Sequence, residues 1–265
     1  MNRLLALLFH DVFVDDPGES GFDGAGAARY KLPLADFDAQ LAGLEAALPC
    51  PPALLAGAYR EGPGTPVAIT VDDGGVSYHS LVADRLEARG WRGHCFVTTG
   101  FIGRRGFLQK HHLRELHARG HGIGSHSVSH PARFSACAPR VMSREWSDSR
   151  RALQDILGAD VTMASVPGGY FSSHVARAAA EAGLSVLFTS EPETQVREIA
   201  GCTVLGRFTA RRGCPADYPA RLVRGSPAAR YGAWLAWNAK KALKAALGDA
   251  YPEIAGRVAR LGRRP

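Results

Sequence analysis

Short apolar runs recur along this chain and alternate with amphipathic segments, which is the pattern of repeated strand–helix units. Seven runs have the length and composition of buried strands: residues 4–9, 67–71, 94–97, 121–124, 163–166, 185–188 and 204–208. Helix-like segments lie between them at residues 34–48, 78–89, 109–119, 143–157 and 173–182. Because strands separated by helices pair in parallel, the pattern predicts an α/β fold built on a parallel sheet.

Polar and reactive residues follow one predicted strand after another. The residues that end the first six runs are His10-Asp11, Asp72-Asp73, Thr98-Thr99, Ser125-His126, Pro167-Gly168-Gly169 and Thr189-Ser190. In a closed parallel barrel the carboxyl ends of all strands meet on one face, where active sites are built. An open, doubly wound sheet would instead gather ligands at a single switch point. We therefore favour a TIM-like barrel and keep the open sheet as the alternative.

Two motifs combine residues that can bind a divalent cation and use it. Asp72 and Asp73 end one apolar run, and His126 and His130 form an H-x-x-x-H pair after a later run. Two imidazoles and the carboxylate of Asp73 would leave room on a metal ion for water and substrate, and these ligands suit Zn²⁺, with Co²⁺ or Ni²⁺ as alternatives. Asp72, beside the ion, can act as the general base. The motifs predict a metal-dependent hydrolase.

Charge is distributed unevenly along the 265 residues. The net charge is +7, and the segment from Arg224 to Pro265 alone carries nine Lys or Arg against two Asp or Glu. The neutral remainder argues against a nucleic-acid surface over the main site. We expect a barrel domain at residues 1–225, followed by a basic amphipathic helical tail at 226–265. Two polar connections, at residues 15–33 and 100–106, are expected to border the substrate groove.

The tail allows two interpretations. Its predicted helix carries Tyr231, Trp234, Leu235, Leu243 and Leu247 near one side and lysines on the others. Such a helix can dock on the barrel with its lysines in water. It can also lie at an anionic membrane surface, which would suit a lipid-linked sugar at the cytoplasmic leaflet of the inner membrane. We favour docking on the barrel.

Cysteine usage and the first residues bear on the compartment. The chain has five scattered cysteines and no C-x-x-C pair, so we expect reduced thiols in a cytoplasmic protein. The N-terminal apolar run is short and is interrupted by His10-Asp11, and we interpret it as a buried strand instead of a signal segment. No run approaches the length needed to span a membrane.

At these motifs the chain resembles the polysaccharide deacetylases, the NodB-homology group of carbohydrate esterases. Their T-F-D-D-G motif matches residues 70–74, with Val71 in place of Phe, and their H-[ST]-x-x-H motif matches residues 126–130. The resemblance extends over about residues 4–208. It implies a distorted (β/α)7 barrel and metal-assisted hydrolysis of an N-acetyl group on an amino sugar.

The resemblance also implies a role for each matched side chain. Asp72 corresponds to the catalytic base of the family. Asp73, His126 and His130 correspond to its metal ligands. These roles agree with the ones that the chemistry of the residues suggests by itself.

The third family motif, R-x-P-[YF]-G, is only partly kept. Residues 164–170 contain the Pro and a Gly but lack the Arg, which orients the base in the family. Arg133 or Arg207 is a candidate to replace it. A backbone N–H of Gly168 or Gly169 can face the oxyanion, although Pro-Gly-Gly is also an ordinary tight turn.

The late Leu-x-His motif of the family is missing, because His174 is the last histidine. Hydrolysis of an amide needs an acid that protonates the leaving amine, and His10 is the best candidate. Residues 8–12 resemble the (M/L)-x-H-x-(I/V) start of the biofilm-polysaccharide deacetylases, in which that His is the acid. Alternatively, His10 caps the strand or contacts substrate. Tyr170 is a candidate sugar contact, with core packing as the alternative.

The sequence thus predicts a cytoplasmic, zinc-type deacetylase acting on an N-acetylated amino sugar of a polysaccharide or glycolipid. A related enzyme on the same barrel, a formamido-sugar lipid deformylase, is the first alternative. The second is a catalytically impaired protein that binds sugars or acts as a scaffold, which the missing Arg and late His would favour.

Overall fold

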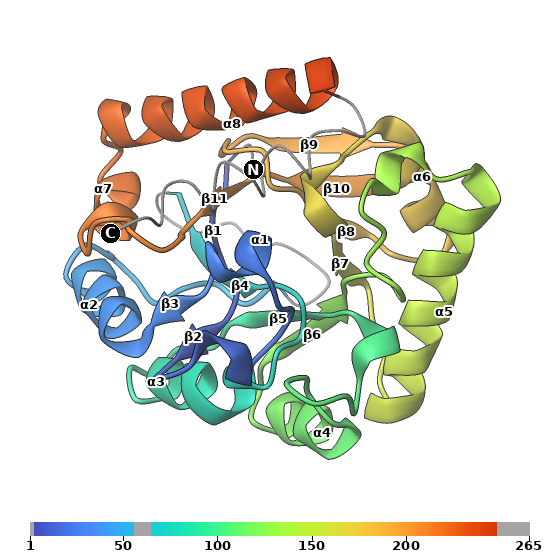
Figure 1. Ribbon diagram of the computed structural model, residues 1–265, viewed down its shortest axis with the longest axis horizontal. Helices are drawn as coiled ribbons and strands as arrows, with labels where there is room; N and C mark the ends of the chain where they lie inside the picture. The colour runs from blue at the N-terminus through green and yellow to red at the C-terminus, as the bar shows by residue number, and fades with distance from the viewer. Residues whose placement is uncertain (1–2, 56–64, 248–265) are drawn as a thin grey trace.

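A nine-stranded sheet occupies the centre of the computed structural model, which describes residues 3–55 and 65–247 (Figure 1). Its strands are β1 (Leu5–Phe9), β4 (Val67–Val71), β5 (His94–Val97), β6 (Gly122–Ser125), β7 (Met163–Ser165), β8 (Val186–Phe188), β9 (Val196–Ile199), β10 (Cys202–Leu205) and β11 (Arg207–Thr209). They follow the order β11-β1-β4-β5-β6-β7-β8-β10-β9, and neighbours are parallel except β9 with β10. A separate parallel pair consists of β2 (Val12–Phe13) and β3 (Leu32–Pro33).

The sheet becomes a barrel through a strand that breaks in its middle. β10 pairs with β8 and β11 pairs with β1, and only Gly206 separates them. A Cβ at Gly206 would lie 2.4 Å from the carbonyl oxygen of Glu191, so only glycine fits there. The strand predicted at 204–208 is therefore two short strands at the seventh position of a distorted (β/α)7 barrel. The predicted barrel is confirmed, and the antiparallel β9 was not predicted.

Helices cover the outside of the sheet. They are α2 (Leu34–Glu45), α3 (Ala83–Glu87), α4 (Lys110–Ala118), α5 (Pro139–Leu157), α6 (Ser173–Glu181), α7 (Tyr218–Val223) and α8 (Pro227–Leu247), while α1 (Ala25–Ala28) lies over the middle of the barrel in Figure 1. Figure 1 shows α2 to α6 arranged around the sheet, with α8 along the top beside α7. The five predicted barrel helices are present. α5 begins earlier than predicted because Pro139 suits a first helical turn, and α7 was not predicted.

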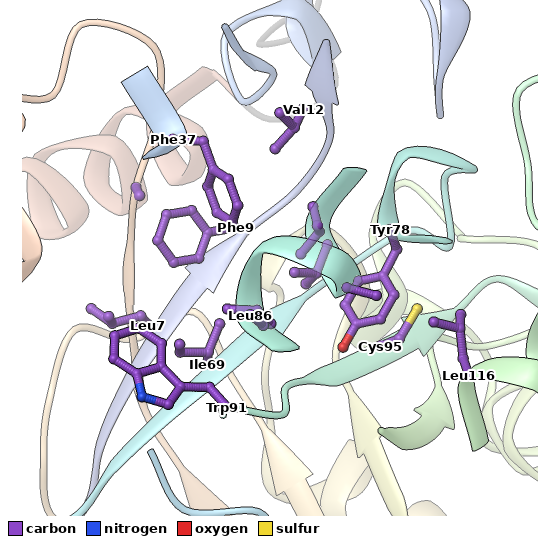
Figure 2. Packing of buried hydrophobic residues seen from close by; sticks show 14 of the residues in the cluster. Leu7, Phe9, Val12, Phe37, Ile69, Tyr78, Leu86, Trp91, Cys95 and Leu116 are labelled. Carbon is purple, nitrogen blue, oxygen red and sulfur yellow. The ribbon is translucent and has the colours of Figure 1, made fainter. Parts of the chain in front are cut away.

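The core lies on both faces of the sheet, because strand side chains alternate between them. Outside the barrel, Leu7, Phe9 and Ile69 pack under the helices, as Figure 2 shows. The rings of Phe9 and Phe37 meet edge to face, 5.3 Å apart, and fix α2 on the sheet. Inside the barrel a second cluster includes Phe96 and other residues of the alternate strand positions. The inside of the barrel is thus filled by apolar side chains.

α8 lies against the barrel through a face other than the expected one. Ala229 is buried, and the Lys240 ammonium donates a hydrogen bond to the hydroxyl of Tyr30 (2.8 Å). The large apolar side chains that we expected to dock are instead 46–60% exposed: Tyr231, Trp234, Leu235 and Leu243. The side chain of Leu247 and the rest of the predicted tail, residues 248–265, lie outside the described residues. The boundary at 225 and the membrane interpretation of the tail stay predictions.

Two further expectations concern thiols and membrane spans. All five cysteines are free thiols, as the sequence predicted. Among residues 3–55 and 65–247, no helix combines the length and apolar character that crossing a bilayer requires.

His94, at the start of β5, is a buried histidine held in one neutral form. Its Nδ1–H donates to the carbonyl of Ile69 (3.1 Å), and its Nε2 accepts the N–H of Leu55 (2.9 Å). Protonation would destroy the second bond, and burial lowers the pKa of His94 to about 4. The unfolded chain therefore binds this proton first as the pH falls. The contribution of His94 to stability is complete above about pH 6.5 and is lost toward pH 4.

We expect the wild-type protein to lose roughly 2 kcal/mol more unfolding free energy between pH 7 and 4.5 than a His94→Gln variant. Denaturant titrations of both proteins at several pH values measure this difference. The contributions of the other titrating groups are the same in both proteins and cancel when the two are subtracted. His117→Gln, at an exposed position of α4, should keep the wild-type dependence. Parallel curves for wild type and His94→Gln would contradict the assignment.

Candidate metal centre

Strand alternation places several polar side chains inside the barrel, near the carboxyl ends of the strands. Ala68 belongs to the inner cluster, so Asp72, four residues on, points toward the same side. Ser165 and Arg207 each lie two residues after an apolar residue of that cluster. These three polar side chains are buried. The alternation along each strand thus directs these three side chains into the same region inside the barrel.

Asp73, His126 and His130 converge at the mouth, as the sequence predicted. The Nε2 atoms of His126 and His130 lie 3.4 and 3.6 Å from Oδ1 of Asp73. Donor atoms around one tetrahedral Zn²⁺ at about 2.0–2.1 Å would be spaced roughly 3.4 Å apart. In the described part of the chain this is the one group of three or more His, Cys, Asp or Glu with metal-site spacing. The donor set and its spacing fit a divalent cation.

Two of the three candidate ligands have unusual backbone conformations. Asp73 has a φ of 77° and His130 a φ of 55°, and Ser127, on the loop between the histidines, has a φ of 66°. Residues other than glycine adopt this left-handed region at an energetic cost, and such strain gathers at functional sites. The turn at Asp73 lets it share the mouth of the barrel with Asp72, although the two are adjacent in the chain.

A carboxylate from α5 holds the loop that carries the histidine pair. Oε2 of Glu145 accepts the backbone N–H groups of Val128 (2.8 Å) and Ser129 (2.9 Å), and Oε1 accepts the Ser129 hydroxyl (2.7 Å). The loop is therefore fixed from outside the barrel, and His130 lies in it instead of on a helix, because the following Pro131 disfavours a helical backbone at His130. Sequence reasoning missed Glu145, because nothing in a helical segment indicates which distant loop it reaches.

The imidazole of His126 is oriented by β7. Its Nδ1 lies 3.0 Å from the Ser165 carbonyl oxygen and 2.5 Å from the Ser165 hydroxyl, which itself donates to Oδ1 of Asp72 (3.0 Å). Nδ1–H is therefore the donor, and Nε2 presents its lone pair toward Asp73. Ser165, which sequence reasoning also missed, stands at the Arg position of the R-x-P motif.

The guanidinium that the motif lacks comes from β11. Arg207 is fully buried and grips Asp72 with two hydrogen bonds, from Nη1 to Oδ1 (2.7 Å) and from Nη2 to Oδ2 (2.8 Å). Its Nε donates to the carbonyl of Thr189 (2.8 Å). Of the two predicted replacements, Arg207 is thus the one on Asp72, while Arg133 lines an adjoining cavity.

The electrostatics of the site favour ionised carboxylates. Burial raises the pKa of Asp72, but the Arg207 guanidinium and then His126 outweigh it, so the pKa lies below its usual value. Burial also raises the pKa of Asp73, and the histidines bring it well below normal. The pKa of His126 is raised, because its two carboxylate neighbours overcome burial, whereas burial and the charge of His126 lower the pKa of His130. Both carboxylates are therefore available as anions.

His10 lines the same cavity, of about 510 Å³, as the three candidate ligands. Its ring packs on Tyr30 with centroids 4.8 Å apart, and its Nδ1 is buried with no hydrogen-bond partner. The cavity extends along the 15–33 connection, which contributes Phe22 beside His130 (5.0 Å between ring centroids). The prediction that this connection borders the groove is confirmed. The buried carboxylate of Asp11, next to His10, fixes the 15–33 connection by accepting a hydrogen bond from the Ser20 hydroxyl.

The third predicted group, the Pro-Gly-Gly turn, forms another wall of this cavity. Gly168 and Gly169 have φ values of 63° and 69°, and the N–H of Gly169 is 3.5 Å from the carbonyl oxygen of Val166. Tyr170 lines the cavity beside them. Trp237 of α8 packs against this turn, since a Cβ at Gly169 would lie 2.6 Å from the indole. The proposed oxyanion and sugar-contact roles of the turn stay predictions.

Comparison with known proteins agrees with this geometry. Residues 59–187, just under half of the chain, match the family model described as Polysaccharide deacetylase. YxkH of Bacillus subtilis (strain 168) is 25% identical over 132 residues, which cover 50% of this chain and 47% of that protein. The chain thus spans about half the length of this curated relative.

Solved structures resemble the whole barrel. The deacetylase PplD of Streptococcus pyogenes, in complex with acetate, superposes with a TM-score of 0.69 at 20% identity, over 84% of this chain and 97% of that chain. IcaB from Ammonifex degensii gives a TM-score of 0.66, again at 20% identity and over 84% and 97% of the two chains. At these identities the likeness establishes the fold.

We expect His130→Gln to weaken binding of Zn²⁺ or Co²⁺ by more than about 100-fold, because one of the three ligands is lost. Loss of a residue that only hydrogen-bonds to a ligand costs at most about 100-fold. Isothermal titration calorimetry of metal-free protein measures this, and circular dichroism checks the fold. His174→Gln, at an exposed position of α6, is the matched control and should bind like wild type. Equal affinity in the two variants would show that the cation binds elsewhere.

Proposed function

Because the chain belongs to the polysaccharide deacetylase family, we propose that it is a metal-dependent hydrolase that removes N-acetyl groups from amino sugars of a polysaccharide or glycolipid. The observation that carries the proposal is the convergence of Asp73, His126 and His130 beside the Arg207-bound Asp72. A cation held there, with Zn²⁺ favoured and Co²⁺ or Ni²⁺ as alternatives, would polarise the acetyl carbonyl and acidify water.

Asp72 is the base in this proposal. Arg207 binds both of its oxygens, which keeps the carboxylate ionised and fixes its direction. The Ser165 hydroxyl adds a third hydrogen bond, to Oδ1. A carboxylate held in this way can accept the proton of the attacking water without first reorienting. Arg207 is a positioning residue, since it acts on the reaction through Asp72.

The opposite side of the cavity supplies the remaining groups. His10, which lines the cavity, donates a proton to the departing amine. A backbone N–H of Gly168 or Gly169 stabilises the oxyanion, and Tyr170 contacts the sugar. In this proposal Arg207 takes the place of the motif Arg and His10 takes the place of the late His, which argues against the non-catalytic alternative.

We expect metal-loaded wild-type protein to release acetate from N-acetylglucosamine derivatives, and Asp72→Asn to lower the rate by about 10²–10⁴-fold, because the base is lost. Asp148→Asn, at an exposed position of α5, is the control. Acetate and formate are assayed together on N-acetyl and N-formyl substrates. Formate release without acetate release would replace the proposal with the deformylase alternative. An Asp72→Asn variant as active as wild type would remove Asp72 as the base.

We expect His10→Ala to lower turnover by about 10²–10⁴-fold while the protein keeps its metal content, because His10 lies in the cavity but is not one of the three ligands. Acetate release and elemental analysis measure the two quantities on the same sample. His117→Ala controls for loss of a histidine. Full activity of His10→Ala would end the acid assignment.

A further inference from the structure

A second cavity adjoins the metal cavity. It has a volume of about 670 Å³ and lies between the barrel mouth, α7 and α8. Tyr30, Thr209, Trp237 and Lys240 line both cavities, so the two share a wall and the same stretch of α8. A substrate that occupies both cavities would therefore place one of its groups in the second cavity, close to the sugar whose amide is hydrolysed.

The charge of the second cavity is strongly one-sided. Five cationic side chains line it besides the Asp72-bound Arg207: Arg29, Arg211, Arg212, Arg221 and Lys240. Its lining, taken from the described residues, contains no Asp or Glu. A concave surface lined by charge of one sign concentrates the field and attracts counter-ions. The ligand expected there is an anion.

Three of these cations have no anionic partner in the described chain. No ion pair or side-chain hydrogen bond joins Arg29, Arg211 or Arg221 to another residue of 3–55 and 65–247. The guanidinium of Arg212, by contrast, donates to the carbonyl of Lys31 (3.3 Å). Three guanidinium groups without an anionic partner among residues 3–55 and 65–247 suit a group with several oxygens and more than one negative charge better than they suit a single carboxylate.

We propose that this cavity binds a phosphate or diphosphate group carried by the substrate, so that the sugar that is deacetylated is a phosphorylated N-acetyl amino sugar. This inference rests on the proposed function and narrows its substrate class. The guanidinium groups of Arg29, Arg211 and Arg221 bind the phosphate oxygens. The shared wall, with Trp237 and Lys240, lies between the phosphate and the sugar in the metal cavity.

Two sources can supply such a group: a soluble sugar phosphate or a lipid-linked one. The part of α8 that lines the cavity includes Ala233 and Trp237, while Tyr231, Trp234, Leu235 and Leu243 of the same helix are 46–60% exposed. Tyr231, Trp234 and Leu235 lie about half a turn around the helix from the lining residues, so a lipid chain leaving the phosphate would have to pass around α8 to cover them. The experiment below distinguishes the two sources.

The first test measures binding without turnover. Pyrophosphate is titrated calorimetrically into the Asp72→Asn protein and into the same protein with Arg211→Gln and Arg221→Gln added. Each lost charged hydrogen bond is worth about a factor of ten, so we expect the affinity to fall by about 10-fold or more. A matched pair of exposed changes, Arg151→Gln with Arg177→Gln, keeps the net charge equal and should leave the affinity near that of the parent.

Three results of this titration would overturn the proposal. They are no binding of pyrophosphate by the parent protein, equal weakening in the two charge-matched variants, and binding of glucuronate as tight as that of pyrophosphate. Because the titration needs no catalysis, it tests the anion site even if acetate release, and with it the proposed function, is not observed.

The second test uses turnover. The ratio of kcat/KM for N-acetylglucosamine 1-phosphate to kcat/KM for the neutral methyl glycoside should exceed one. It should fall by about 10-fold or more in Arg211→Gln/Arg221→Gln, chiefly through KM. An unchanged ratio would overturn the proposal. A faster reaction of a phytyl-linked sugar diphosphate, lost in Trp234→Ser/Leu243→Ser, supports the lipid source, and equal rates support the soluble one.

Discussion

The ion pair between Arg207 and Asp72 connects the architecture of this barrel to its chemistry. A guanidinium with no exposed surface is costly to bury unless its N–H groups are satisfied. Here two N–H groups face Asp72, one faces the carbonyl of Thr189, and Nη1 also lies 3.2 Å from the Thr70 hydroxyl. The rings of Phe96 and Phe188 lie 5.8 and 5.7 Å away and exclude water. Since Arg207 begins the strand that pairs with β1, closure of the barrel and orientation of the base depend on the same few residues.

Strain and support are balanced around the candidate ligands. Asp73 and His130 adopt left-handed backbone conformations, and each such residue costs on the order of 1–3 kcal/mol. The surrounding structure keeps them there: Glu145 fixes the histidine loop from α5, and Ser165 fixes the ring of His126. A protein selected only for stability would have little reason to keep this arrangement. The strain is accepted where three donor atoms have to face one point.

Local pattern was enough to predict the barrel and its candidate ligands, because strand length, alternation and strand-end residues are local properties. The local pattern could not predict whether Arg133 or Arg207 contacts Asp72, since the answer depends on how the strands pair across the closed sheet. That pairing changes at Gly206, where β10, the partner of β8, gives way to β11, the partner of β1. Periodicity also failed for α8. An apolar stripe shows that a helix has two faces, but not which one a neighbour covers, and Trp237 was not recognised as the contact residue. The supporting partners Glu145 and Ser165 are polar residues whose targets are far away in the chain.

The position of α8 has a consequence for how such proteins can diversify. Trp237 packs on the Pro-Gly-Gly turn and Lys240 reaches Tyr30, so the helix completes walls that the barrel leaves open. It is therefore not an appendage that recombination could exchange between homologues without loss. A graft that joined this barrel to a foreign C-terminal segment would lose the contacts of Trp237 and Lys240 and leave the cavity wall incomplete.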